Sequence, residues 1–252
     1  MRKFISKQLN KNDKLIKHSL IVFIAVGIGS LFNYIFQLYM GRALGPEGYG
    51  ILGALFSIFY VFVAPSNTIQ TIIAKFTSEY KAKDEYGKIH TLLTYSFKKL
   101  ILYGIIGLII YAALSKFIAG FLNINQVSLV ILMGVVLLLS LLTSIMNGIL
   151  AGLQRFNWFA VNGIAMPFSK LFFGVLLVTF GFGVFGAVNA LNIAAIAAIL
   201  LPLIPLWFLF KHEKKPIDGM EIYKYSFFVL TATMALLLLT NIDMILVKHY
   251  FP

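Results

Sequence analysis

The stretch QLYMGRALGPEGYGILGALFSIF, residues 37–59, joins two apolar runs through a short turn, GRALGPEGYG, that contains four glycines. Glycine permits a tight reversal of the chain, and Pro46 cannot continue a helix that arrives from the N-terminal side. The turn lacks the glycine–lysine–serine or glycine–lysine–threonine ending of a nucleotide-binding P-loop. It therefore indicates a helical hairpin, and the composition of the chain decides whether that hairpin lies in water or in a membrane.

The chain of 252 residues is too apolar to be a soluble protein. Hydrophobic residues make up 60% of it and charged residues 12%, whereas soluble domains are typically about 45–50% apolar and about 25% charged. A chain with so few charged residues cannot cover its surface with polar groups, so it needs an apolar solvent, the hydrocarbon core of a bilayer. The sequence contains no cysteine, which excludes disulfides, thiolate nucleophiles and thiolate metal ligands.

Seven continuous apolar runs are long enough to cross a bilayer, because a helix needs about 20 apolar residues to span a core of about 30 Å. Their continuity is not typical of barrel strands, which alternate apolar and polar residues. The sequence therefore predicts an all-α integral membrane protein with about seven transmembrane helices. Residues 19–210 form a six-helix bundle, 211–224 a cytoplasmic connection and 225–252 a seventh helix in this prediction. The runs are 19–40, 49–74, 99–121, 128–150, 157–181, 184–210 and 225–247.

The basic residues of the connections lie almost all on one side of the predicted bundle. Of the 21 lysines and arginines, 17 fall in the segment 1–18 and in the second, fourth and sixth connections. The positive-inside rule then places the N-terminus of this multi-pass protein in the cytoplasm, within the cell (cytoplasmic) membrane. Residues 1–18 are interpreted as a basic cytoplasmic arm, and 75–98 as an amphipathic cytoplasmic helix and turn. This topology and contact with anionic membrane lipid account for the net charge of +12, so no nucleic-acid partner is expected.

The titratable residues show no pattern typical of an enzyme or a metal site. The one adjacent acidic pair, Asp84–Glu85, lies in a lysine-rich connection, where a solvated surface explains it. The four histidines stand singly near the ends of apolar runs. Membrane glycosyl or phosphoryl chemistry would need paired carboxylates, a histidine cluster or a metal site. We therefore expect no enzymatic activity, no cofactor and no metal.

Two ionisable residues lie inside apolar runs, where burial is costly and often functional. Lys170 lies about 13 residues from the start of the run 157–181, about 20 Å along a helix, which is too deep for easy escape to the interface. It is predicted to face the lumen of the bundle, with snorkelling to the interface as the alternative. Asp243 lies near the outer end of the run 225–247 and fits ion coupling or a structural carboxylate equally well.

Prolines and amides interrupt the same runs. Pro65 and Pro167 are expected to kink their helices, and the freed carbonyls must then face protein or a watery cavity. Some of these amides are explained by hydrogen bonds between helices, which contribute about 0.6 kcal/mol each to helix association. The combination favours a transporter, whose cavity candidates for substrate binding are Lys170, Asn33, Gln37, Asn67, Gln70 and Asn162. Arg42 and Glu47, in the outer turn, are assigned a local structural role.

Three stretches resemble the oligosaccharide flippases and polysaccharide-biosynthesis exporters of the multidrug/oligosaccharidyl-lipid/polysaccharide exporter superfamily. GRALGPEGYGILGALFSIFYVFVAPSNTIQTIIAKFTSEY, residues 41–80, resembles the first two helices of that family. GILAGLQRFNWFAVNGIAMPFSKLFFGVLLVTFGFGVFGAVNA, residues 148–190, resembles its connection between helices 4 and 5 and its turn before helix 6. TNIDMILVKHYF, residues 240–251, resembles its seventh helix. The resemblance covers residues 15–252.

The resemblance implies two six-helix bundles that face a central cavity and open it to the two sides in turn. A lipid-linked oligosaccharide would enter from the cytoplasmic leaflet and leave outward, and basic residues in the cavity would bind the pyrophosphate of the lipid carrier. Lys170 fits this role best. Since the first run offers only Asn33 and Gln37, the polysaccharide branch of the family is favoured over the peptidoglycan branch.

The resemblance also carries expectations about partners, because the chain stops just after the seventh helix, where the family continues. The chain is then a fragment of a longer transporter, or it pairs with a second half-transporter or with itself as a homodimer. Glycan-assembly proteins are further candidates.

Two alternatives stay open: a drug or organic-cation antiporter of the same superfamily, and a non-transporting membrane scaffold of a glycan-assembly complex. An antiporter should carry a carboxylate inside its N-terminal bundle, yet Asp243 is the only acidic residue inside an apolar run. A scaffold should tolerate the replacement of Lys170 by alanine, whereas a flippase should not.

Overall fold

The structure, a computed structural model, describes the backbone of residues 2–250 and the side chains of residues 16, 19–60, 65–233 and 235. Every regular element in this range is helical. The all-helical membrane fold predicted from the apolar runs is confirmed. The elements are α1 (Arg2–Ala43), α2 (Gly45–Ala82), α3 (Tyr86–Phe121), α4 (Val127–Gly152), α5 (Phe156–Leu177), η1 (Val178–Phe182), α6 (Gly183–Leu200), α7 (Leu203–Leu206), η2 (Trp207–Lys211) and α8 (Gly219–Tyr250).

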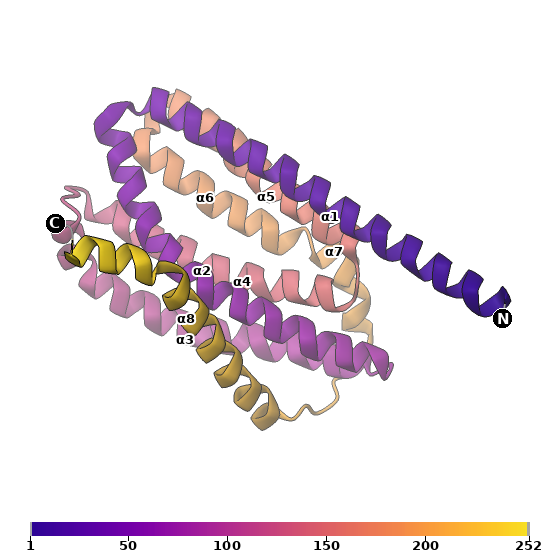
Figure 1. Ribbon diagram of the computed structural model, residues 1–252. Coiled ribbons are helices and arrows are strands. Elements are labelled where there is room, and N and C mark those ends of the chain that lie inside the picture. Colours follow the sequence, from indigo (N-terminus) through magenta and orange to yellow (C-terminus); the bar gives the residue numbers. More distant parts are fainter. Residues whose placement is uncertain (1, 251–252) are drawn as a thin grey trace.

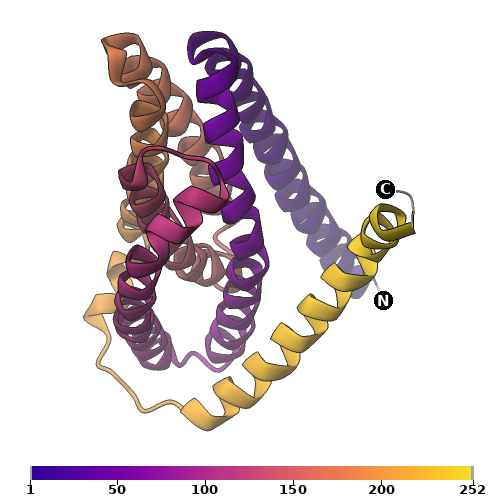
Figure 2. The ribbon, with the colours of Figure 1, turned by 90° about the vertical axis from the view of Figure 1, so that its left-hand side faces the viewer.

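The helices α1 to α6 run antiparallel to their neighbours in the chain, so their connections alternate between the two ends of a bundle (Figure 1). α1, α5 and α6 form one group and α2, α3 and α4 another, and α4 also packs against α6. α8 packs against α2 and crosses the outside of the bundle (Figure 2). We call the end with the α2–α3 turn and the start of α8 the basic end, and the other the far end.

The long helices account for the predicted spans. Ser19–Ala43, Tyr86–Phe121, Val127–Gly152 and Phe156–Lys211 are each long and apolar enough to cross a membrane. The last of these folds back on itself at Gly181 and Gly183, which have φ values of +87° and +51° and so turn α5 into α6. α2 is a bent span, and its two parts, Gly45–Tyr60 and Pro65–Ala82, are inclined by 42°. The kink expected at Pro65 is therefore present, and the seventh predicted run falls within α8.

The turn at residues 41–50 is tighter than its glycine pattern suggests. α1 ends at Ala43 and α2 begins at Gly45, so Leu44 alone separates the two helices. Gly45 has a φ of +69°, which glycine adopts without strain. Pro46 occupies the first turn of α2, where a helix has no acceptor for the missing N–H.

Residues 75–98 differ from the prediction, because they do not form a separate amphipathic helix. α2 continues to Ala82 and α3 begins at Tyr86, so the polar segment consists of the ends of two long helices. Its amphipathic pattern arises because these ends extend beyond the apolar runs while still packing on their neighbours. The basic segment 1–18 is similarly helical from Arg2 and continuous with the rest of α1.

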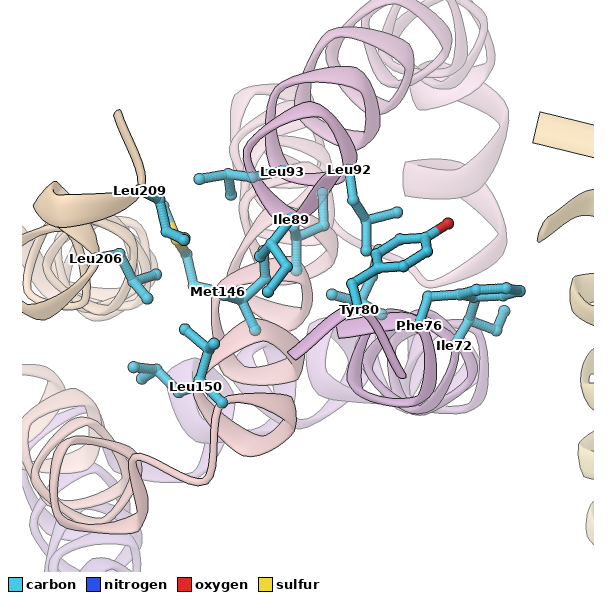
Figure 3. Packing of buried hydrophobic residues seen from close by; sticks show 14 of the residues in the cluster. Ile72, Phe76, Tyr80, Ile89, Leu92, Leu93, Met146, Leu150, Leu206 and Leu209 are labelled. Atoms are coloured by element: carbon cyan, nitrogen blue, oxygen red, sulfur yellow. The ribbon is translucent and has the colours of Figure 1, made fainter. Parts of the chain in front are cut away.

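Close contact between α2 and α4 organises the core at the basic end. Gly148 and Gly152 lie one turn apart on α4 and face α2: a Cβ atom at Gly152 would lie 2.5 Å from Thr77 Cβ and 2.7 Å from the Ala74 carbonyl oxygen. Small residues at this spacing let helix backbones approach closely in lipid, where van der Waals packing drives association. Around this contact lie buried side chains of α2, α3, α4, α7 and η2, including Phe76, Leu92, Met146, Leu206 and Leu209 (Figure 3).

The connection from η2 to α8 is fastened to the first turns of α3. The Nδ1 atom of His90 lies 2.8 Å from the His212 carbonyl oxygen, and Thr91 Oγ1 donates to the Lys215 carbonyl oxygen at 2.7 Å. The Lys215 backbone N–H donates to the Gly87 carbonyl oxygen at 3.3 Å. These bonds set where α8 begins.

Acid should weaken a small ion-pair network on α2. Glu79 lies 3.3 Å from Lys83 and 3.5 Å from Lys75, and the hydrogen bond from Lys83, with the nearby lysine charges, lowers the pKa of Glu79 below 4.5. The resulting stabilisation is present above pH 4.5 and is lost as the pH falls through the lowered pKa. Because exposed pairs contribute about 0–1 kcal/mol, Glu79→Gln should lower the melting temperature slightly at pH 7, and this effect should shrink as the pH falls through the lowered pKa. Glu47→Gln, at a residue outside the ion pairs found among the described residues, should have no such pH-dependent effect.

Candidate functional site: the α1–α5 seam

Lys170 lies in a seam between α1 and α5. α1 contributes Gly29, Asn33, Phe36 and Met40, which recur every three or four residues and therefore share one face. α5 contributes Gly163, Pro167, Lys170 and Gly174 at the same spacing. The two faces meet along much of their length, as Figure 1 shows for the paired ribbons of α1 and α5. We call these eight residues the α1–α5 seam.

Pro167, which lies inside α5, shapes the part of the seam nearer the basic end. Proline has no N–H, so the carbonyl oxygen of Gly163, four residues earlier, loses its helical donor. That oxygen faces α1, and a Cβ atom at Gly29 would lie 2.8 Å from it and 3.5 Å from Pro167 Cγ. Gly29 thus permits the backbones to approach, and the freed carbonyl faces protein, as the membrane requires.

Substitution at Gly29 should separate the two helices. Gly29→Ala places a methyl group against a backbone oxygen, which cannot swing away as a flexible side chain can. We expect it to destabilise the protein by about 1–3 kcal/mol, the usual cost of overpacking. The measurement is thermal unfolding in detergent. Gly27→Ala, two residues away on α1 with open space around the new Cβ, is the matched control and should be neutral or slightly stabilising.

Lys170 holds the charge of the seam. Its Nζ atom donates a hydrogen bond to Asn33 Oδ1 and lies 4.6 Å from the centre of the Phe36 ring. Lys170 is half-buried, Asn33 is exposed and Phe36 is fully buried. None of the ion pairs found among the described residues neutralises Lys170. An ammonium has three N–H donors, so this one can still bind an anion that reaches the exposed side of the seam.

The depth of Lys170 gives this charge its importance. It follows Phe156, the first residue of α5, by about 14 residues, which is about 21 Å along the helix axis. A bilayer core is about 30 Å thick, so the ammonium lies well inside it. A half-buried lysine at this depth that none of the described ion pairs neutralises attracts anions far better than it would in water.

The other predicted residues lie in several places. Gln37, one turn beyond Asn33, accepts a hydrogen bond of 3.2 Å from the Tyr49 hydroxyl and so links α1 to α2. Arg42 and Glu47 are exposed at the α1–α2 turn. Asp243 lies in the part of α8 whose side chains fall outside the described residues.

The three amides beyond α1 have distinct surroundings. Asn67 is exposed on α2, and its backbone carbonyl oxygen accepts a hydrogen bond of 2.9 Å from Thr71 Oγ1. The backbone of Gln70 lies against Gly148 of α4. Asn162 is buried and donates to Asn147 Oδ1 at 2.8 Å and to the Ala198 carbonyl oxygen at 3.2 Å, which ties α4, α5 and α6 together.

The structure therefore brings Lys170 and Asn33 together and adds two residues that sequence reasoning missed. Phe36 places an aromatic ring beside the ammonium. The sequence signal that could have identified it is its position three residues after Asn33, which puts both on one face of the helix. Thr179 of η1 shares a hydrogen bond of 2.7 Å with the Tyr39 hydroxyl and fastens the seam at the far end. Phe36, which also lies against Gly174, and the Tyr39–Thr179 pair both hold α1 in place on the far-end side of the lysine.

The sequence matches the model of the polysaccharide biosynthesis protein family over residues 15–251. No curated protein is significantly similar to it. With its multi-pass helical fold, this match defines the class: a multi-pass membrane protein of a polysaccharide biosynthesis family. The chain belongs to the polysaccharide biosynthesis protein family.

Solved structures with the same fold are transporters. A MATE protein in the straight conformation matches with a TM-score of 0.76 at 16% identity, over 91% of this chain and 54% of that one. An outward-facing multidrug resistance MATE family transporter of the MOP superfamily matches with 0.70 at 17%, over 86% and 52%. A MOP superfamily transporter from Pyrococcus furiosus matches with 0.71 at 17%, over 91% and 54%. The chain thus spans about half the length of these transporters.

Proposed function

We propose that this protein forms part of an exporter that flips a lipid-linked oligosaccharide or polysaccharide precursor across the cytoplasmic membrane by alternating access. One observation carries the proposal: the seam holds an ammonium deep in the span that no ion pair among the described residues neutralises, where a carrier lipid would bring a phosphate or pyrophosphate. The family match supports the glycan class of the substrate.

The proposed site works by charge and geometry without bond making. Lys170 would donate to the phosphate oxygens, and Asn33 would hold the ammonium in place when no substrate is bound. The Phe36 ring offers the cation a weak attraction that an anion can readily outcompete, since cation–π contacts contribute about 0.5–2 kcal/mol. Gln37, Asn67, Gln70 and Asn162 stay candidates for contact with sugar hydroxyls or for support of the cavity wall.

A transport path on this side needs a second wall. The outer face of α1 is apolar and exposed, with Phe23 75% and Tyr34 61% accessible. We propose that a second bundle faces α1 and α5, supplied by a longer polypeptide, a separate half-transporter or a second copy of this chain. The substrate would then pass between the two walls at the level of Lys170.

The orientation is part of the proposal. The basic end carries the lysines of the second and sixth connections, and the positive-inside rule assigns it to the cytoplasm together with the N-terminus. Lys170 would then be reached from the cytoplasmic leaflet in one state and from outside in the other.

Two transport assays in parallel test the substrate class. Vesicles containing the protein should move a fluorescent lipid-linked pyrophosphate oligosaccharide between leaflets, and they should not export a cationic dye on an ion gradient. Gradient-driven dye export without glycan movement would overturn the proposal in favour of an antiporter. Normal glycan phenotypes with Lys170→Ala would instead favour a scaffold.

A further inference from the structure

A second recess, far from the seam, lies along α3. It has a volume of about 630 Å³ and lies among α2, α3, α4 and the first turns of α8. Its α3 wall includes Lys99, Tyr103, Gly107, Ile110 and Leu114. The lining is apolar apart from the end near Lys99 and the hydroxyl of Tyr111, which has no hydrogen-bond partner among the described residues. We call it the α3 groove.

The α3 groove is open toward lipid. Tyr103, Ile110 and Leu114, which line it, are 58%, 55% and 51% exposed. Gly107 contributes to the opening, because a Cβ atom there would meet no atom within 4 Å. From Lys99 to Leu114 the groove follows about 22 Å of helix, which is longer than the roughly 15 Å of one leaflet's hydrocarbon.

The groove has a polar, basic mouth at one end only. Lys99 is half-buried and takes no part in the ion pairs found among the described residues, and its Nζ atom lies 5.6 Å from the rings of both Tyr95 and Tyr103. The Tyr95 and Tyr223 hydroxyl oxygens lie 3.1 Å apart across the mouth. This hydrogen bond raises the pKa of Tyr223 to about 12. One hydroxyl of the pair donates to the other, so the accepting hydroxyl keeps its own O–H free to donate.

We propose that the α3 groove binds an anionic phospholipid, with one acyl chain along α3 and the phosphate at Lys99, Tyr95 and Tyr223. The match is one of chemistry and length. The ammonium of Lys99, which is in none of the described ion pairs, and hydroxyl donors lie at the mouth, and a largely apolar channel long enough for an acyl chain follows. A zwitterionic lipid would bind less tightly through its phosphate, because the cation of its own headgroup already balances the phosphate charge. The proposal does not depend on the transported substrate.

Such a lipid would also touch α8. Ile222, Tyr223 and Ser226 form the wall opposite α3 near the mouth, and the same turns of α8 hold Tyr225 against Phe76 of α2. A bound lipid would therefore bridge α8 to the bundle and help to fix its position.

Photo-crosslinking tests the groove without any transport assay. The full chain is placed in nanodiscs of equal parts phosphatidylglycerol and phosphatidylcholine, with one of the two lipids carrying a diazirine on its acyl chain. Peptides from residues 99–114 should crosslink to phosphatidylglycerol about fivefold more than to phosphatidylcholine, the preference that one lysine near the surface provides. Equal labelling by the two lipids would overturn the proposal.

Matched variants separate a built site from the general lipid shell. Lys99→Gln should reduce the preference to parity, whereas Lys116→Gln, an exposed lysine on the same helix, should keep it. Gly107→Leu fills the groove and should abolish labelling there, whereas Gly120→Leu, also on α3 and in open space, should not. Displacement by a polyprenyl phosphate, but not by excess phosphatidylserine, would assign the groove to a carrier lipid and overturn the assignment to a membrane phospholipid.

Discussion

Lys170→Met should reduce glycan translocation by about 100-fold, because removing one partner of a buried charge contact costs about 2–5 kcal/mol. Methionine has a similar length and flexibility, so the seam should keep its packing while losing its only described charge. Asn33 is exposed and can be solvated when its donor is gone, so the variant should fold. The measurement is the initial rate of leaflet exchange in vesicles, normalised to the amount of protein in the membrane.

Two further variants make this result specific. Lys170→Arg keeps the charge and should keep a substantial part of the rate, although the planar guanidinium changes the geometry. Lys116→Met removes an exposed lysine of α3 and should leave the rate unchanged. Normal transport by Lys170→Met, at normal abundance, would remove the seam from the proposed transport path.

Gly152→Ala should destabilise the close contact between α2 and α4. The new methyl carbon would lie 2.5 Å from Thr77 Cβ and 2.7 Å from the Ala74 carbonyl oxygen, so α2 and α4 would have to move apart. The contact lies in the core of the basic end, beside Phe76 and Met146, and little there can give way (Figure 3). We expect a loss of at least about 1–3 kcal/mol, seen as a lower melting temperature in detergent.

Gly120→Ala provides the comparison for Gly152→Ala. It adds the same methyl group to a helix position where nothing lies within 4 Å. Because alanine has a higher helix propensity than glycine, the variant should be neutral or slightly stabilising. Equal melting temperatures for the two variants would mean that α2 and α4 do not meet closely at the Gly148 and Gly152 turns.

The fold could be read from composition, because bilayer thickness leaves few choices for long apolar runs. The positions of the spans follow from that constraint, and glycine and proline mark the hairpin around Gly45 and the kink at Pro65. The error at residues 75–98 has a simple physical origin. Helices need not end where the membrane ends, and polar continuations of α2 and α3 resemble a separate amphipathic helix in sequence.

The site could be predicted only in part, because pairing between helices is a long-range property. The depth of Lys170 was visible in the sequence, but its partners were not. Within Ser19–Ala43, α1 carries apolar residues on every side, so no apolar stripe marks the face that meets α5. Amides also look alike before folding. Asn33 meets the lysine, whereas Asn162 uses its amide hydrogens to tie three helices together in the core.

Binding of a lipid-linked pyrophosphate oligosaccharide to the protein in nanodiscs is the most direct test of the central claim, that Lys170 receives the anion of the substrate. The titration compares the unmodified chain, Lys170→Met and Lys170→Arg, with a neutral glycolipid of the same chain length as the control ligand. We expect saturable binding that weakens at least about tenfold in Lys170→Met, since a lost charge contact contributes at least about 1.4 kcal/mol, and that is largely kept in Lys170→Arg. The same affinity in all three proteins, or equal affinity for the neutral glycolipid, would contradict the claim.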